Sequence, residues 1–192
     1  IHLRDTLDPD IIGIQETKVN DPEFPVDVIK EIGYHPEYWG QKGHYGVAIL
    51  SKKKPIEVQK GFIKDTAEDQ KRFIQAKFKW GKKSIMIMNG YFPQGENRSH
   101  EIKFPKKIKY YSDLKKHIKK IQKNEDNLIV MGDFNVAPSP LDIGIGEINA
   151  KRWLKEGKTA FLPEEIDMWN SIQELGFVDS WREQNPLEDS IY

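Results

Sequence analysis

Residues 128–142, LIVMGDFNVAPSPLD, carry the side chains whose types and spacing best suit chemistry. Four apolar residues run into Gly132, and Asp133 and Asn135 follow before prolines break the chain. A carboxylate at such a point can bind a metal ion or take a proton from an attacking water. A carboxamide can donate hydrogen bonds to phosphate oxygens without adding negative charge. An Asx-type turn uses the same residue types, so the motif taken alone leaves both interpretations open.

Two further apolar runs end in polar side chains. PDIIGIQE ends in Gln15 and Glu16, and SIMIMNGY brings Asn89 and Tyr91. Ligand sites lie where strands end and their loops diverge, so strand ends that meet here would form a cleft lined with hard oxygen donors. Such donors suit Mg²⁺ or Mn²⁺ and the hydrolysis of a phosphate ester. A solvated strand end for Glu16 and an ordinary Asn-Gly turn are the alternatives.

The elements that must position these groups mix strands and helices. Short apolar or alternating runs predict strands, and a three- and four-residue spacing of apolar side chains predicts helices. The expected strands are 9–15, 47–51, 73–80, 84–93 and 128–134, and the expected helices are 108–123 and 164–176. The third and fourth strands form a hairpin, and the alternation in FIQAKFKW predicts one buried and one exposed face. We predict an α/β sandwich with sheet layers inside, a single domain over residues 1–192.

The overall composition limits the chemistry and the partners. Thirty Lys and Arg balance thirty Asp and Glu in 192 residues, so no net charge draws the whole chain to nucleic acid. The absence of Cys excludes disulfides, thiolate nucleophiles and Cys-bound zinc. No apolar run is long enough to span a membrane, and we expect a soluble, cytoplasmic protein with no membrane partner.

One segment departs from the overall charge balance. Residues 98–123 hold ten Lys and Arg against two acids, a net charge of +8, with three aromatic residues among them. Basic side chains that contact phosphates supply sequence-independent affinity for nucleic acid. A solvated helix face is the alternative for this segment. His44, His100 and His117 show no metal-ligand spacing and are expected to be structural or surface residues.

Five motifs, in this order along the chain, resemble those of a known family. They are IIGIQETK, GHYGVAILSK, NGYFPQGENRSHEIKFPKK, VMGDFNVAPSPLDIGI and KRWLKEGKTAFLPEE. Together they resemble the exonuclease III family of Mg²⁺-dependent apurinic/apyrimidinic (AP) endonucleases, in particular its bacterial branch, over essentially the whole chain. The resemblance implies the endonuclease/exonuclease/phosphatase fold, a four-layer sandwich of two mixed β-sheets flanked by helices.

The resemblance also implies an activity, a cofactor and a substrate. Enzymes of this family cut the DNA backbone 5′ to an abasic site, remove blocked 3′ ends and take nucleotides from duplex 3′ ends. They act as monomers on double-stranded DNA and use Mg²⁺, for which Mn²⁺ can substitute. Two alternatives stay open: a phosphoesterase of the same fold that acts on a phosphoinositide or sphingolipid, and a module that binds damaged duplex DNA without cutting it.

Motif by motif, the resemblance assigns roles to four residues. Glu16 in QETK corresponds to the metal-binding glutamate, and Tyr111 in KIKYY to the active-site tyrosine near the scissile phosphate. Asp133 in GDFN corresponds to the aspartate that transfers a proton, and Asn135 to the asparagine that orients the phosphate. The implied reaction is in-line attack of water on phosphorus, with no covalent enzyme intermediate.

Further residues are implied to approach DNA. Tyr45 and Gly46 in GHYGVA and Arg72 in KRF belong to this group, with packing as the alternative for Arg72. The loop after Asp142 is implied to insert into DNA and hold a kinked duplex. Its candidates are Asn149, Lys151, Arg152 and Trp153, with a core position as the alternative for Trp153.

The chain departs from the family pattern at both ends. Family members begin with a strand bearing an S-F-N-I-N-G-type motif and end with an R-I-D-type aspartate and an S-D-H motif, which residues 1–192 do not contain. We therefore expect a domain that is incomplete at both ends and lacks N- and C-terminal strands. The chain by itself is expected to have lost most activity, because the absent groups stabilise charge during the reaction.

Overall fold

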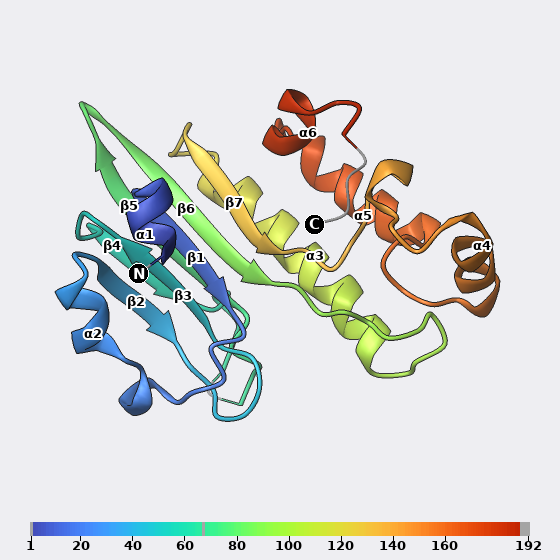
Figure 1. The fold of residues 1–192 in the computed structure, drawn as a ribbon, viewed down its shortest axis with the longest axis horizontal. Helices are drawn as coiled ribbons and strands as arrows, with labels where there is room; N and C mark the ends of the chain where they lie inside the picture. Colours follow the sequence, from blue (N-terminus) through green and yellow to red (C-terminus); the bar gives the residue numbers. More distant parts are fainter. Residues whose placement is uncertain (1, 67, 189–192) are drawn as a thin grey trace. The chain divides into compact units, whose positions relative to one another are not determined.

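The computed structural model describes residues 2–66 and 68–188 and divides the chain into two compact units (Figure 1). The sheet unit comprises Ile1–Tyr91 and Ile121–Phe134, and the helical unit comprises Phe92–Lys120 and Asn135–Tyr192. The expectation of one domain stays a prediction. Of the helices in the described residues, none combines the length and apolar character needed to cross a membrane.

The strands of the sheet unit form two sheets, with orders β1-β3-β2 and β4-β5-β6-β7. The strands are β1 (Ile11–Gln15), β2 (His35–Trp39), β3 (Val47–Ser51), β4 (Glu57–Lys60), β5 (Phe73–Trp80), β6 (Lys83–Tyr91) and β7 (Leu128–Asp133). Its helices are α1 (His2–Leu7), the 3-10 helix η1 (Asp21–Glu23) and α2 (Val26–Glu31).

The two sheets differ in the direction of their strand pairs. In the three-stranded sheet, β3 pairs antiparallel with both β1 and β2. In the four-stranded sheet β5 pairs antiparallel with β4 and β6, whereas β6 and β7 run parallel. A parallel pair requires a long crossover, and helix α3 (Lys103–Ile121) lies in the chain between these two strands. The expected α/β fold with two sheets is confirmed.

The sheets face each other across an apolar core. Its buried members are Val47, Ile49, Ile74, Ala76, Phe78 and Ile87. The alternate residues of β3, Ala48 and Leu50, pack on the other face of their sheet with Phe24, Ile29 and Tyr34. β3 is therefore buried on both faces. This explains its unbroken apolar run VAILS, because a strand without a solvated face has no place for alternating polar residues.

The helical unit is built from helices and the loops between them. It contains α3 except for its last residue, the 3-10 helix η2 (Pro140–Asp142), α4 (Glu147–Glu156), α5 (Pro163–Gln173) and α6 (Ser180–Gln184). α3 buries Tyr111, Leu114 and Ile118, which recur at three- and four-residue spacing and so share one face. Phe92 packs against Tyr111, with ring centroids 4.9 Å apart.

Most predicted elements are confirmed, with boundaries moved by a few residues. The strands expected at 9–15, 47–51, 73–80, 84–93 and 128–134 and the helix expected at 164–176 are β1, β3, β5, β6, β7 and α5. The helix expected at 108–123 begins earlier, at Lys103. Pro105 does not prevent this, because it lies in the first turn, where a missing N–H breaks no helical hydrogen bond.

The alternation predicted for FIQAKFKW is wrong at Gln75, which is 4% exposed, and at Trp80, which is 61% exposed. Phe62 stacks on Phe73, two residues earlier on the same face of β5, at a centroid distance of 4.4 Å. This face of the strand is therefore also covered, and Gln75 bonds Gln59 of the neighbouring strand instead of water. Packing partners from distant parts of the chain decided this burial, and the alternation of β5 does not contain them.

β6 and β7 approach closely at Gly132, where φ is +135° and an added Cβ would lie 1.9 Å from the carbonyl oxygen of Gly90. We predict that Gly132→Ala destabilises the protein by at least about 3 kcal/mol, because backbone must shift. Gly81→Ala in the β5–β6 turn is the matched control. Its φ is +59° and nothing lies within 4 Å of the added Cβ, so only the cost of the left-handed conformation, about 1 kcal/mol, remains. Urea denaturation measures both variants, and equal losses would contradict the close approach.

Candidate active site

Glu16 and Tyr91 meet where β1 and β6 end. The Tyr91 hydroxyl donates a 2.5 Å hydrogen bond to Glu16 Oε1, and Lys18 Nζ lies 2.6 Å from Oε2. The contacts with Lys18 and then Tyr91 lower the pKa of the Glu16 carboxyl below its ordinary value. Glu16 is therefore a carboxylate at neutral pH, an exposed and anionic hard oxygen donor.

Tyr91 is held in its neutral form. Burial and the hydrogen bond to Glu16 raise the pKa of Tyr91 to about 12. Asp133 stands opposite Tyr91 in the parallel pairing of β6 with β7, and its negative charge adds to the rise. The strand ends thus bring two carboxylates to one phenol, and that phenol remains a hydrogen-bond donor at neutral pH.

Asn89 ties the ends of strands from the two sheets together. Its side chain is completely buried, and its Nδ2 donates 2.9 Å hydrogen bonds to the carbonyl oxygens of Ile14 and Ala48. Its Oδ1 accepts a 2.6 Å hydrogen bond from Gln15 Nε2. A single carboxamide on β6 therefore fixes the ends of β1 and β3. Glu16, the residue after Gln15, is held beside the end of β6 for this reason.

Arg72 lies against the rings of both Tyr45 and Tyr91. Its guanidinium carbon is 4.2 Å from the Tyr45 centroid and 4.6 Å from the Tyr91 centroid. Its Nε donates a 2.7 Å hydrogen bond to Gln70, which in turn donates to the Tyr45 hydroxyl at 2.8 Å. Tyr45 and Arg72, both predicted to approach DNA, are thus brought to the strand ends that carry Glu16. Their contact with DNA stays a prediction.

The backbone beside these side chains adopts conformations that non-glycine residues rarely take. φ is +54° at Glu16, +57° at Lys18 and +60° at Tyr45. Hydrogen bonds from Thr17 N to Gly46 O (3.2 Å) and from Lys18 N to Tyr45 O (3.0 Å) join the two loops. A Cβ at Gly46 would lie 2.0 Å from Thr17 Oγ1, so this close approach requires glycine. Strain of this kind gathers at functional sites.

In the helical unit, Asn135 is fixed through both its side chain and its backbone. Its Nδ2 donates a 2.9 Å hydrogen bond to the carbonyl oxygen of Phe92. Its own carbonyl oxygen accepts a 2.7 Å hydrogen bond from Lys107 Nζ. Its φ is +51°, a left-handed conformation that Asn tolerates better than most residues. The protein therefore orients the carboxamide, and its role at a phosphate stays a prediction.

Tyr111, which the resemblance places near the scissile phosphate, is a buried residue of α3. Its side chain is 2% exposed, and its ring packs against Phe92. The role of Tyr111 at a phosphate stays a prediction. The helical spacing with Leu114 and Ile118 was the sequence signal for this burial. Sequence reasoning gave no role to Tyr91, the strand-end tyrosine that contacts Glu16.

The segment expected to insert into DNA is helix α4. Lys151 and Arg152 are exposed and pair with acids one turn away, and Asn149 donates a hydrogen bond to the backbone one turn back. Trp153 is half-buried and stacks on Phe161, with parallel rings and centroids 6.1 Å apart. This stacking fits the core alternative for Trp153, and DNA contact by Asn149, Lys151, Arg152 and Trp153 stays a prediction.

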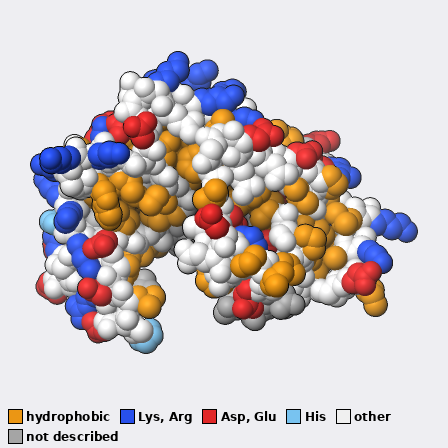
Figure 2. Space-filling model, turned by 90° about the horizontal axis from the view of Figure 1, so that it is seen from above, with side chains coloured by type: hydrophobic (Ala, Val, Ile, Leu, Met, Phe, Trp, Pro, Cys, Tyr) orange, Lys and Arg blue, Asp and Glu red, His pale blue; other side chains and the backbone are white. Residues whose placement is uncertain are grey.

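The basic segment 98–123 does not present charge of a single sign. Arg98 pairs with Glu164 at 2.5 Å and Lys109 with Asp113 at 2.5 Å. Figure 2 shows Lys and Arg side chains interspersed with Asp and Glu on the face that it displays. Exposed pairs of this kind are weak and sensitive to salt, so a phosphate can replace the acid at small cost. DNA binding by this segment stays a prediction.

The carboxylates fit a hard divalent cation. Within residues 2–66 and 68–188, no group of three or more His, Asp or Glu side chains is placed to hold a metal ion. Mg²⁺ does not need such a group, because it keeps several waters and is held by one or two carboxylates together with substrate phosphates. Glu16 supplies an ionised and exposed carboxylate of this kind.

Comparison with known proteins gives consistent matches along the chain. The Endonuclease/Exonuclease/phosphatase family matches residues 2–186. Exodeoxyribonuclease III of Haemophilus influenzae is 47% identical over 184 residues, which cover 96% of this chain and 69% of that protein. The match is therefore nearly complete for the chain described here and spans about two thirds of the relative.

Two solved structures share the fold. A 3′ phosphatase from Neisseria bound to a product DNA hairpin has a TM-score of 0.87 and 27% identity, over 97% of this chain and 68% of that one. An AP endonuclease from Archaeoglobus fulgidus has a TM-score of 0.82 and 34% identity, over 98% of this chain and 68% of that one. These likenesses confirm the expected fold class.

The pKa of Tyr91 is raised to about 12, so we predict that its phenolate absorbance appears only at high pH in a spectrophotometric titration. Subtracting the titration curve of Tyr91→Phe from that of the wild type identifies this signal. Glu16→Gln removes the anionic acceptor, so the midpoint falls toward the ordinary value of about 10, while burial keeps it above that value. Because the folded-state pKa is raised, this group's contribution to stability is complete below about pH 10 and disappears as the pH rises toward 12. A midpoint that Glu16→Gln leaves unchanged would contradict the contact.

Proposed function

Because this chain belongs to the endonuclease/exonuclease/phosphatase family and to its exonuclease III branch, we propose that it is a metal-dependent phosphodiesterase of DNA repair. It cuts duplex DNA 5′ to abasic sites and has 3′–5′ exonuclease and 3′-phosphodiesterase activity. The contact of ionised Glu16 with neutral Tyr91, opposite Asp133, carries the proposal. Two carboxylates and a phenol together are what cation-assisted attack on a phosphodiester needs.

Glu16 would hold the cation, for which we propose Mg²⁺, with Mn²⁺ as a substitute. When bound, the cation supplies neutralisation of the charge on the phosphate. The hydrogen bonds from Lys18 and Tyr91 keep the Glu16 carboxyl ionised, so it is ready for a cation at neutral pH. The half-exposed position of the carboxylate leaves room for the waters that Mg²⁺ retains.

The proton chemistry falls to Asp133, which is exposed at the end of β7. It takes a proton from the attacking water as the water oxygen bonds to phosphorus. The P–O3′ bond breaks, and the proton passes to the leaving oxygen, which yields a 3′-hydroxyl and a 5′-phosphate on the abasic side. Tyr91, neutral at this pH, donates a hydrogen bond to a phosphate oxygen. For Asn135 we keep the role that the resemblance implies, orientation of the phosphate by its carboxamide.

Duplex DNA is the substrate class that the relatives favour, since those described above act on DNA by their names or are bound to it. Arg72 between two tyrosine rings offers charge and aromatic surface to such a substrate. Lys151 and Arg152 of α4 offer exposed cations to phosphates. The monomeric state and the cytoplasmic location stay predictions.

Two alternatives lead to different results in solution. A module that only binds damaged DNA gains nothing from Glu16 and Asp133, because carboxylates repel phosphates unless a cation lies between them. A phosphoesterase of the same fold with a phosphoinositide or sphingolipid substrate would use the same carboxylates. It would leave an abasic duplex uncut, so the choice of substrate separates the two enzymes.

We predict that the protein, assayed together with the terminal strands that the family pattern implies, makes a single nick 5′ to the lesion in a duplex oligonucleotide with one abasic-site analogue, with Mg²⁺ and not with EDTA. Asp133→Ala lowers the rate at least about 100-fold, as loss of a general base does. Asp126→Ala, an exposed acid just before β7, is the matched control and leaves the rate unchanged. Salt-sensitive duplex binding without a nick would favour the binding module, and cleavage of a phosphoinositide alone would favour the lipid enzyme.

The two candidate tyrosines are separated by a second comparison. We predict that Tyr91→Phe lowers the single-turnover nicking rate by about 100-fold, in the range for loss of one donor to a developing charge. Tyr111→Phe lowers it much less, because that ring is 2% exposed. Thermal denaturation of both variants shows whether either loss reflects unfolding. A larger loss in Tyr111→Phe would return the role to Tyr111.

A further inference from the structure

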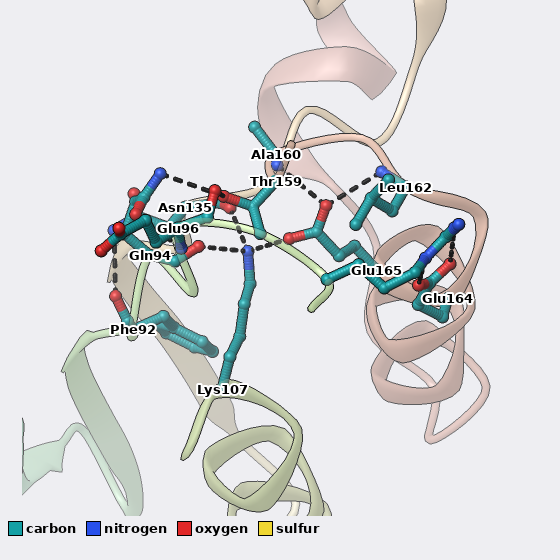
Figure 3. Close-up of polar contacts among 11 residues, drawn as sticks. Phe92, Gln94, Glu96, Lys107, Asn135, Thr159, Ala160, Leu162, Glu164 and Glu165 are labelled. Atoms are coloured by element: carbon teal, nitrogen blue, oxygen red, sulfur yellow. Dashed lines mark hydrogen bonds and ion pairs between the residues drawn. The ribbon is translucent and has the colours of Figure 1, made fainter. Parts of the chain in front are cut away.

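Lys107 of α3 is completely buried and meets three acceptors (Figure 3). Its ammonium pairs with the carboxylate of Glu165, and both side chains are 0% exposed. Lys107 Nζ also donates to the carbonyl oxygens of Asn135 at 2.7 Å and Gln94 at 3.3 Å. An ammonium group has three N–H donors, so each has its acceptor.

Glu165 is itself held in place at the start of α5. Its Oε2 accepts hydrogen bonds from Ala160 N at 2.8 Å and from Leu162 N at 2.9 Å. Leu162 is the N-cap residue of α5. The carboxylate therefore satisfies N–H groups at the beginning of the helix, where negative charge is also favoured by the helix dipole. The anion that faces Lys107 is fixed from its other side.

The loop after β7 rests on the same segment. Ala137 N donates a 2.7 Å hydrogen bond to Ala160 O. Gln94, whose carbonyl oxygen faces Lys107, donates from its side chain to Thr159 Oγ1 at 3.0 Å. Thus the loop that begins with Asn135 and the loop that carries Gln94 are both anchored at residues 159–160. Figure 3 shows the side chain of Lys107 rising from α3 toward these loops.

We propose that Lys107 is a positioning residue for Asn135 in phosphodiester hydrolysis, an inference that rests on the proposed function. The ammonium bonds the carbonyl of a residue whose φ is +51°, a backbone conformation that persists only when its surroundings hold it. With the backbone held, the hydrogen bond from Nδ2 to Phe92 O orients the carboxamide. Lys107 is 0% exposed, so it acts through Asn135 and not on DNA.

A buried ion pair is a poor device if stability is all that it provides. Removing both charges from water costs about as much as their attraction returns, and an apolar pair of similar size serves a fold equally well. An apolar pair cannot donate a hydrogen bond to the carbonyl oxygen of Asn135. The directional donor is what Lys107 adds, and it explains why a charge is kept in this place.

A double-mutant cycle tests the inference. Lys107→Met/Glu165→Gln removes the ammonium without leaving an unpaired charge, and the new amide oxygen can still accept from the start of α5. We expect kcat for nicking an abasic duplex to fall about 10- to 100-fold, the range for partners that support a catalytic group. The Kd for the duplex stays unchanged. In an Asn135→Ala background the same double substitution is expected to lower kcat by less than about a further twofold. If the loss from Asn135→Ala and the loss from the double substitution multiply, the inference is overturned.

The matched control is a second Lys–Glu pair, in the sheet unit. Lys77 and Glu125 pair with side chains 22% and 12% exposed, and Lys77→Met/Glu125→Gln is expected to leave kcat unchanged. Circular dichroism and thermal denaturation verify folding. If the Lys107→Met/Glu165→Gln variant does not fold, Lys107→Arg/Glu165→Asp replaces it in the cycle. This second variant keeps both charges but displaces the donor, and the same fall in kcat is expected.

A readout that does not depend on cleavage separates this inference from the proposed function. The NMR signal of the Asn135 side-chain amide, identified by its loss in Asn135→Ala, is expected to shift in Lys107→Met/Glu165→Gln and not in the control pair. If the signal shifts in this variant but the wild-type protein with its terminal strands makes no nick, the proposed function is overturned and the positioning of Asn135 stands. A signal that does not move overturns the positioning, whether or not the chain cuts DNA.

Discussion

The parallel pairing of β6 with β7 is the constraint on which the site depends. At Gly132 the two backbones come so close that a Cβ would lie 1.9 Å from the carbonyl oxygen of Gly90. One residue further along, the same register sets Tyr91 opposite Asp133. Pairing register moves in whole residues, and a slip of one would turn every side chain to the other face. Two chemically active groups from distant parts of the sequence therefore share one place because of main-chain hydrogen bonds.

Electrostatic interactions then give Glu16 and Tyr91, which the strand ends bring together, different protonation states. Glu16 is ionised because Lys18 and Tyr91 donate to it, and Tyr91 is neutral because burial and the same hydrogen bond oppose its ionisation. A single contact thus prepares both an anionic oxygen donor and a neutral hydrogen-bond donor. The buried carboxamide of Asn89 holds this contact together, because it ties the end of β6 to the neighbouring sheet.

The helical unit fixes its functional residue by other means. Asn135 follows a strand, in a loop without a ladder of main-chain hydrogen bonds to set its backbone. A buried ammonium on α3 and a buried carboxylate at the start of α5 take that task. Strand register cannot hold a left-handed residue in a loop, whereas a charged donor with three satisfied bonds can. Rigid support comes from the sheet in one unit and from a buried ion pair in the other.

The sequence by itself determined β1, β3, β5, β6 and β7, the amphipathic α3 and the polar residues at the strand ends, because local periodicity and chain breaks govern these features. It did not predict β2 and β4. Its motifs also indicated the family. Only the tertiary structure decided that Tyr91 stands beside Glu16, whereas the spacing of Tyr111 on the apolar face of α3 already predicted its burial. It also decided that Lys107, one of ten cations in a basic run, is buried. Composition counts charges, but the partners that make burial of a charge possible lie far away in the chain, and only folding brings them together.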